Sequence, residues 1–280
     1  MVRYTISMFD THTHLNFPDE YADIEAVISR AHKAGVSHIL IPSTDIPASE
    51  GAVEIAQLWP HIYAAVGIHP SDISGDLSEE IETVSKIAQS SEKVVAIGEI
   101  GLDYYWIFKT MGGDKAQKPA RDEAMAIQKE YLIAQLELAH NLNKAVIIHC
   151  RQAKKPLLEV LNQHWGSHFE GRMVFHCCEP DSDLLKFALS HNVYIGYDGD
   201  LTYNQQKQAF IHDVPLERIV LETDAPFLTP DPVRQTKKFP NEPANLSYVA
   251  AAVAHYKEIS LEKVIAQTME NSCALFGITG

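Results

Sequence analysis

The chain has few cysteines and no long apolar run. No apolar stretch approaches the roughly 20 residues that a membrane-spanning helix needs, and the first ten residues lack the apolar segment of an export signal. The sequence therefore predicts neither membrane insertion nor export, and we expect a cytoplasmic protein. The four cysteines are too sparse for a disulfide framework and none forms a CxxC pair, so we expect reduced thiols.

Basic residues are also scarce. The 23 Lys and Arg stand against 37 Asp and Glu, which gives a formal net charge of −14. No general positive field would attract a phosphate-rich polymer, although a bound divalent metal supplies local positive charge even in an acidic protein. GxSxG, P-loop and GxGxxG motifs are absent from a strand–turn–helix context, so a serine nucleophile and a nucleotide-binding fold lack their markers.

Short β-branched or apolar runs alternate with longer amphipathic segments, which is the pattern of repeated βα units. Eight such runs begin near residues 8, 36, 61, 93, 145, 172, 192 and 218. This count predicts one α/β domain, residues 1–280, closed as a TIM-type (β/α)8 barrel. Apolar residues at helical spacing are clearest over residues 121–143.

Residues 106–119 interrupt this rhythm. They contain Gly112, Gly113 and three lysines, and directly follow the fourth predicted strand, which predicts a loop on the face where barrel active sites lie. The loop is either a lid or substrate contact, or a solvated insertion.

Two histidines alternate at the end of the first predicted strand. Successive strand side chains point to opposite faces, so His12 and His14 share one face, and Asp10 could orient one of their rings. Later strands also end in residues able to bind zinc and similar metals. These strands read as buried on both faces, where an unpaired ionisable group is costly, and one shared metal site would give every such group a partner. The later candidates are Glu99, His149, His176 and Asp224.

Two carboxylates suit particular roles. Glu99 has glycines nearby on both sides, so its carboxylate could approach two ions, whereas the structural alternative is an ion pair. Asp224 could touch an ion and accept a proton from water, whereas the alternative is a turn aspartate. His69 and Arg151 are candidates for contact with an anionic substrate, or else are loop residues bonded to the backbone.

Other side chains near these motifs favour packing roles. Cys177 and Cys178 follow a proposed ligand, yet without a second cysteine pair they are expected to pack beneath the site. Tyr104 and Tyr105 either line the pocket or pack as ordinary aromatic residues.

The motifs MFDTHTHL, GIHP, GEIGLDYY, VIIHCR, VFHC, ETDAPFL and TMENSCALFG resemble, in this order, those of the TatD family of metal-dependent deoxyribonucleases. The resemblance implies the barrel of the wider metal-dependent hydrolase superfamily and hydrolysis of DNA phosphodiester bonds, often from the 3′ end, with two divalent ions (Mg, Mn or Zn). It implies that one ion is held by His12, His14, Glu99 and Asp224. It implies a second ion held by Glu99, His149 and His176, with His69 and Arg151 near the scissile phosphate.

Two departures from the family pattern border the predicted pocket. CCEPDSD follows the histidine at 176 where the family usually has a Cys-Phe-Ser-Gly type turn, and residues 106–119 look longer than usual. Glu179, Asp181 and Asp183 would repel a phosphate backbone if they faced it.

The favoured function is a metal-activated attack of water on phosphorus, with DNA as substrate, Asp224 as proton acceptor and no obligate protein partner. The first alternative is a hydrolase of the same barrel acting on amide, lactone or aminoacyl ester substrates, since an activated water serves acyl transfer equally well. The second is a binding or scaffold protein with a structural metal, which would have a closed coordination sphere.

Overall fold

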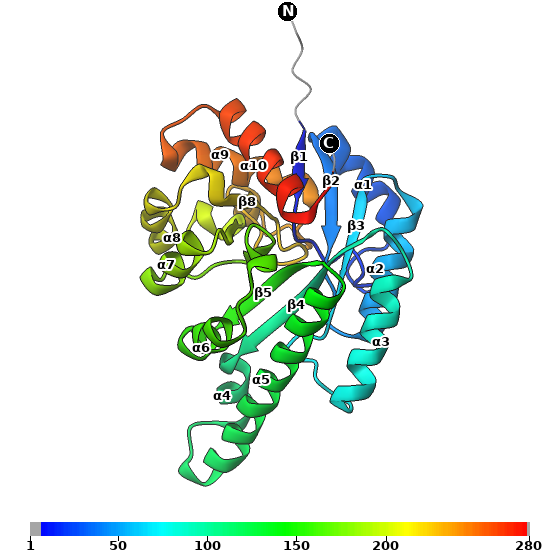
Figure 1. Ribbon diagram of the computed structural model, residues 1–280. Coiled ribbons are helices and arrows are strands. Elements are labelled where there is room, and N and C mark those ends of the chain that lie inside the picture. The colour runs from blue at the N-terminus through cyan, green and yellow to red at the C-terminus, as the bar shows by residue number, and fades with distance from the viewer. Residues whose placement is uncertain (1–6, 279–280) are drawn as a thin grey trace, which may run out of the picture.

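Eight parallel strands follow one another in chain order around a barrel, with helices on its outer face (Figure 1). The computed structural model describes residues 7–278. The strands are β1 (Met8–Asp10), β2 (Val36–Ile41), β3 (Ile62–Val66), β4 (Val94–Asp103), β5 (Ala145–Arg151), β6 (Met173–Phe175), β7 (Tyr194–Tyr197) and β8 (Ile219–Leu221).

The first and last strands meet through backbone contacts. The Thr11 amide donates to the Leu221 carbonyl at 3.0 Å, and Thr13 forms a parallel bridge with Ala225. The predicted (β/α)8 barrel is confirmed, and its closure brings residues near both ends of the chain into one site.

Side chains of the strands divide by alternation into an inner and an outer layer. One buried cluster contains Phe9, Leu40 and Ile147 together with several strand alanines, and Phe276 at the end of the last helix packs against it. A second, larger cluster contains the alternate strand residues and the inner faces of the helices. The strands are therefore buried on both faces, as their nearly continuous apolar runs predict.

The helices surround this sheet. They are α1 (Ile24–Lys33), α2 (Ile46–Leu58), α3 (Leu77–Gln89), α4 (Tyr104–Met111), α5 (Lys118–Asn141), α6 (Lys154–His164), α7 (Ser182–Ser190), α8 (Gln205–Phe210), α9 (Leu246–Lys257) and α10 (Leu261–Phe276). Several begin at an aspartate whose carboxylate accepts backbone N–H groups of the first turn, as Asp45 and Asp76 do. None of the helices within residues 7–278 combines the length and apolar character needed to cross a bilayer.

The prediction of a loop over residues 106–119 is wrong for most of this segment. Helix α4 begins directly after β4, where Asp103 accepts the backbone N–H of Trp106, and it ends at Met111, before Gly112, whose φ is 68°. Residues 115–117 form a single 3-10 turn before α5. The two glycines form only the turn after α4. The residues before them form a helix because buried Tyr104 and Ile107 give it an apolar face that packs on the rest of the protein. Together, α4 and the first turns of α5 extend to the lower end of the molecule in Figure 1.

Candidate metal centre

The six predicted ligands meet at the C-terminal ends of the strands. A cavity of about 880 Å³ opens there, and five of the six line it. His12 lies beneath the cavity floor and is fully buried. Active sites of such barrels occupy this face, because the loops after each strand converge on it.

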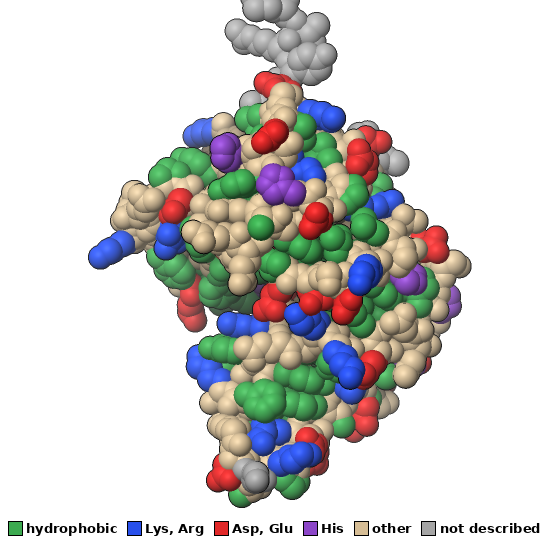
Figure 2. Space-filling model, turned by 90° about the vertical axis from the view of Figure 1, so that its left-hand side faces the viewer, with side chains coloured by type: hydrophobic (Ala, Val, Ile, Leu, Met, Phe, Trp, Pro, Cys, Tyr) green, Lys and Arg blue, Asp and Glu red, His purple; other side chains and the backbone are tan. Residues whose placement is uncertain are grey.

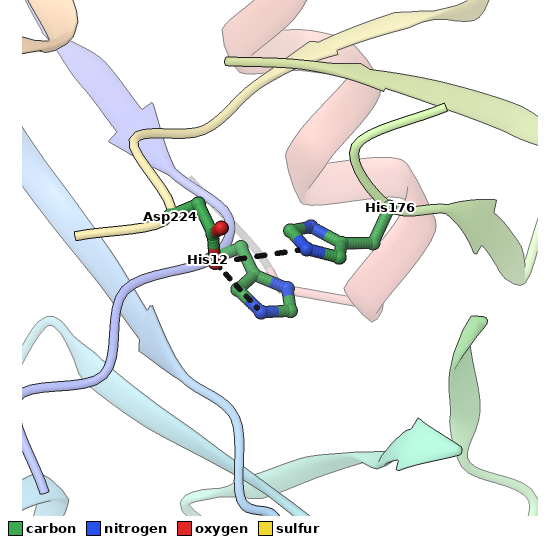
Figure 3. Close-up of side chains that lie close together, drawn as sticks. All are labelled: His12, His176 and Asp224. Atoms are coloured by element: carbon green, nitrogen blue, oxygen red, sulfur yellow. Dashed lines mark ion pairs between the residues drawn. The ribbon is translucent and has the colours of Figure 1, made fainter. Parts of the chain in front are cut away.

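Three of these side chains come from the beginning, middle and end of the chain. The ring of His176 stacks on that of His12 with 3.4 Å between centroids, and Asp224 lies beside both (Figure 3). Asp224 Oδ1 is 3.7 Å from His12 Nε2 and 3.6 Å from His176 Nε2. The backbone places Asp224 there, since its N–H donates to the His12 carbonyl at 2.9 Å.

The donor atoms on the β1 side have spacings that suit a shared cation. His12 Nε2 lies 3.2 Å from His14 Nε2 and 3.3 Å from Glu99 Oε2. Zinc–imidazole bonds are 2.0–2.1 Å long, so tetrahedral ligand atoms lie about 3.3 Å apart. Imidazole and carboxylate donors together fit zinc and neighbouring divalent ions.

Glu99 faces two groups of donors with its two oxygens. Oε2 is directed at His12 and His14, whereas Oε1 lies 2.8 Å from His149 Nδ1 and 3.8 Å from His176 Nε2. The side chain is only 4% exposed. A carboxylate in this position can contact a cation on each side.

The glycines beside Glu99 allow strand β4 to approach β5. A Cβ at Gly98 would lie 2.7 Å from Ile147 Cβ, and one at Gly101 would lie 1.9 Å from the His149 carbonyl oxygen. Glycine at these positions is therefore required by backbone packing, which in turn brings Glu99 within reach of His149.

His69 belongs to the donor group on the β5 side. Its Nε2 lies 4.0 Å from Glu99 Oε1, and its ring centroid is 4.4 Å from that of His149. His69, Glu99 and His149 can offer three ligand atoms to one ion. His176, by contrast, contacts His12 and Asp224 as closely as it does Glu99.

Two buried carboxylates that sequence reasoning missed contact the proposed ligands from behind. Asp103 Oδ2 lies 3.1 Å from His149 Nε2, and Glu222 Oε1 lies 3.1 Å from His176 Nδ1. Such carboxylates fix the orientation of a ligating imidazole and raise its basicity. Strand alternation could have found Asp103, because it lies four residues after Glu99 on the same strand.

Asp10 does not orient an imidazole, contrary to expectation. Its carboxylate accepts the backbone N–H of His12 at 3.3 Å, and the N–H and hydroxyl of Thr223 at 3.0 and 2.6 Å. Strand β1 ends at Asp10, so alternation does not continue through the histidines. Asp10 instead ties the ends of β1 and β8 together. Its burial raises its pKa to about 8, against the effect of the Thr223 hydrogen bonds.

The proposed ligands perturb one another's protonation. Burial opposes charging of His176, but the carboxylates of Glu222 and Glu99 raise its pKa to about 10. Burial likewise opposes charging of His149, whose pKa Asp103 and Glu99 raise to about 9. Burial of Glu99 opposes its ionisation, yet the imidazoles of His176 and His12 hold its pKa well below the usual value. A cation entering the site must displace these protons.

Lys207 neutralises an acidic group on the opposite side of the cavity. Its Nζ lies 2.9 Å from Asp198, 2.8 Å from Asp200 and 3.4 Å from Cys177 Sγ. Although Cys177, Asp198 and Asp200 could offer three ligand atoms, the ammonium group already provides a cation there. Burial raises the pKa of the Cys177 thiol well above its usual value and that of Cys178 to about 12, which disfavours a nucleophilic role.

The acidic residues after His176 differ in where they face. Glu179 lines the cavity, whereas Asp181 caps α7 and lies 2.6 Å from Lys154 Nζ. Asp183 lies on the outer surface of α7, next to Lys186. Of these three acidic residues, only Glu179 therefore lies where it could repel a phosphate backbone within the cavity.

Comparison with known proteins places this site in a family. The family model described as TatD related DNase matches residues 9–277. The uncharacterized metal-dependent hydrolase YabD of Bacillus subtilis is 36% identical over 273 residues, which cover 97% of this chain and 99% of that protein. The 3′-5′ ssDNA/RNA exonuclease TatD of Enterobacter lignolyticus is 33% identical, covering 97% of this chain and 99% of its own length.

A solved structure agrees with these matches. The TatD homologue YJJV from Escherichia coli superimposes with a TM-score of 0.82 at 28% identity, over 97% of this chain and 98% of its own.

Proposed function

This chain belongs to the TatD family of metal-dependent hydrolases, and on that basis we propose that it cleaves phosphodiester bonds of single-stranded DNA from the 3′ end. The observation that carries the proposal is the position of Glu99, whose two oxygens face two groups of imidazoles at the floor of an open cavity. A centre with two divalent cations suits the displacement at a phosphate.

We assign the ligands by their positions. His12, His14 and Asp224 face one side of Glu99, and His149 faces the other. His176 lies between the two sides and contacts Asp224 and Glu99 alike. We add His69 to the His149 side, since its Nε2 points at the same carboxylate oxygen. Cations of magnesium, manganese or zinc held there would lower the pKa of a water molecule and offset charge on the phosphate oxygens.

Individual side chains take the remaining roles in the proposed reaction. Asp224 faces the cavity with its side chain 14% exposed, and we assign it the proton of the attacking water. Arg151 lines the same cavity from the end of β5 and supplies positive charge for the substrate backbone. Asp103 and Glu222 hold the rings of His149 and His176 in place.

Two alternatives are less well supported. The TatD proteins of Enterobacter lignolyticus and Escherichia coli, which are 33% and 30% identical to this chain, are named as 3′-5′ ssDNA/RNA exonucleases, which favours a phosphodiester over an amide, lactone or aminoacyl ester. A structural metal would need a closed coordination sphere, whereas the cavity above these ligands leaves room for water and substrate.

We also infer that the chain forms a single domain, because the eight strands within the described residues 7–278 form one sheet; the first six and last two residues of the predicted domain 1–280 lie outside that range. Its four free cysteines are consistent with a reducing compartment such as the cytoplasm.

The Asp224→Asn variant tests the assignment. We expect cleavage of a 5′-labelled single-stranded oligonucleotide to fall by at least about 100-fold under magnesium, manganese or zinc, with metal content by mass spectrometry largely retained. Asp183→Asn, which removes an exposed carboxylate on α7, is the matched control and should cleave normally. Full activity of Asp224→Asn would refute its role. If the unaltered protein cleaves no oligonucleotide but hydrolyses small amides or esters, the nuclease proposal fails.

A further inference from the structure

One wall of the cavity carries cations in contact with aromatic rings. Arg151 lines the cavity, and its Cζ lies 3.8 Å from the ring centroid of Tyr105. Lys109 Nζ lies 4.1 Å from the centroid of Trp106, which also lines the cavity and is 38% exposed. We call Tyr105, Trp106, Lys109 and Arg151 the stacking wall.

The stacking wall carries uncompensated positive charge. Of the three basic residues that line the cavity, Lys154 is paired with Asp181, and Lys207 is paired with two aspartates. Within residues 7–278, neither Arg151 nor Lys109 lies within 4 Å of a carboxylate oxygen. The unpaired basic side chains that can attract a polyanion entering the cavity therefore belong to the stacking wall.

The opposite wall has a different character. It presents Asp200, and Lys207 there is already paired with Asp198 and Asp200. Helix α4 lies at the lower end of the molecule, where Lys and Arg side chains gather among hydrophobic ones on the face shown in Figure 2. Acidic side chains form a row above them. This asymmetry directs a phosphate backbone along the α4 side of the cavity.

The stacking wall is fixed to the metal centre by one carboxylate. Asp103 Oδ2 lies 3.1 Å from His149 Nε2, while Oδ1 accepts the backbone N–H of Trp106 at 3.0 Å. The start of α4 and a proposed ligand therefore share a single anchor. Such an arrangement keeps a bound group at a constant distance from the reacting centre.

Together these features indicate which kind of ligand the stacking wall would bind. Exposed aromatic rings and guanidinium planes stack on nucleobases, and the adjoining cations pair with phosphates. We propose that the stacking wall holds an unpaired nucleobase and its neighbouring phosphate, and so selects single-stranded nucleic acid. In a duplex both faces of each base are covered by neighbouring bases, so the stacking wall cannot engage one. This inference rests on the proposed function, because it deepens the substrate choice of the same site.

The test measures binding separately from cleavage. The full-length Asp224→Asn protein, loaded with manganese, is titrated with a fluorescent eight-nucleotide thymidine DNA strand and followed by anisotropy. Matched strands carry an abasic site at each of the three 3′ nucleotides in turn. We expect Trp106→Leu to weaken binding of the complete strand by about 5- to 150-fold, as expected for loss of one base–aromatic stack. One abasic strand should bind both proteins with the same affinity.

The control is Phe108→Leu, an exposed aromatic residue on the same helix that packs over Arg121 and is not part of the cavity lining. It should bind all strands like its parent. Lys109→Gln should reduce the slope of log K against log salt by about 0.7, the value for one phosphate of a single strand. The complementary duplex should bind more weakly than the single strand.

The stacking-wall proposal is overturned if Trp106→Leu binds the complete strand normally, or loses equal affinity for complete and abasic strands. If the unaltered protein cleaves DNA but binds complete and abasic strands equally well, the proposed function stands and only the stacking-wall proposal is refuted. Binding that depends on the base, without cleavage under any metal, retains the stacking wall and refutes the nuclease.

Discussion

Replacing Glu222 with glutamine tests how the proposed ligands are held in position. Glu222 is 1% exposed, and its Oε1 lies 3.1 Å from His176 Nδ1 and accepts the Cys177 N–H at 2.6 Å. Glutamine keeps the shape that fits against Gly196, where a Cβ would lie 2.5 Å from the carboxylate oxygens. The change therefore removes a charge and little else.

The expected loss follows from the contact with His176. A doubly charged ion interacts with Glu222 more strongly than the single proton that it displaces from His176, so metal affinity falls. We expect about tenfold weaker binding, which is the lower end of the 10- to 100-fold range for such contacts.

The variant should also change how metal binding depends on pH. The carboxylates near His176, with Glu222 foremost, raise its pKa to about 10 against the effect of burial, so binding to the unaltered protein tightens as pH rises toward that value. Without the Glu222 charge the pKa is lower, and the pH dependence between pH 7 and 9 becomes shallower. Manganese titration calorimetry of chelator-treated protein at several pH values measures both effects.

Glu179→Gln is the matched control, because it removes a negative charge from the cavity wall and Glu179 pairs with none of the proposed ligands. It should bind manganese within twofold of the unaltered protein. If Glu222→Gln shows the same affinity and the same pH slope as the unaltered protein, Glu222 does not position His176 for a metal.

Two further predictions concern stability. Lys207→Met should lower the free energy of unfolding by about 3–5 kcal/mol in urea titrations, because it leaves Asp198 and Asp200 buried without their cation, and adding Asp198→Asn should restore part of the loss. The metal-free protein should lose stability above pH 6.5, since the folded-state pKa values of His149 and His176, about 9 and about 10, exceed those of the unfolded chain. Thermal unfolding from pH 6 to 10 measures this, and a His176→Gln variant that falls equally steeply would contradict it.

The fold was predictable because strand and helix periodicities are local properties of the sequence. Eight apolar runs with helical segments between them were enough to predict the barrel, and α5 was placed to within a few residues. Helix α4 was missed, because Gly112, Gly113 and the lysines dominated the local pattern. Its start depends on a cap from Asp103 and its packing on buried Ile107, which only the folded chain reveals.

The proposed ligands were predictable for a similar reason. Ionisable residues such as Glu99 and His149, placed directly after buried strands, need a partner, and parallel strands of a barrel end on one face. Such reasoning identifies side chains whose donor atoms could meet at one ion. It does not find the supporting carboxylates, since the contact of Glu222 with His176 depends on how β8 packs next to β7 and β6.

The sequence by itself determined the barrel, the residue types at its strand ends and the membership of a metal-dependent family. Only the tertiary structure decided that His176 stacks on His12 and that His69 joins the His149 side. It also decided that charged Lys207 is paired with two aspartates, whereas Arg151 lies over an aromatic ring. The physical reason is that strand alternation depends on neighbours in the chain. The partners of a buried charge come from strands and helices far apart in sequence, and they are fixed only when the barrel closes.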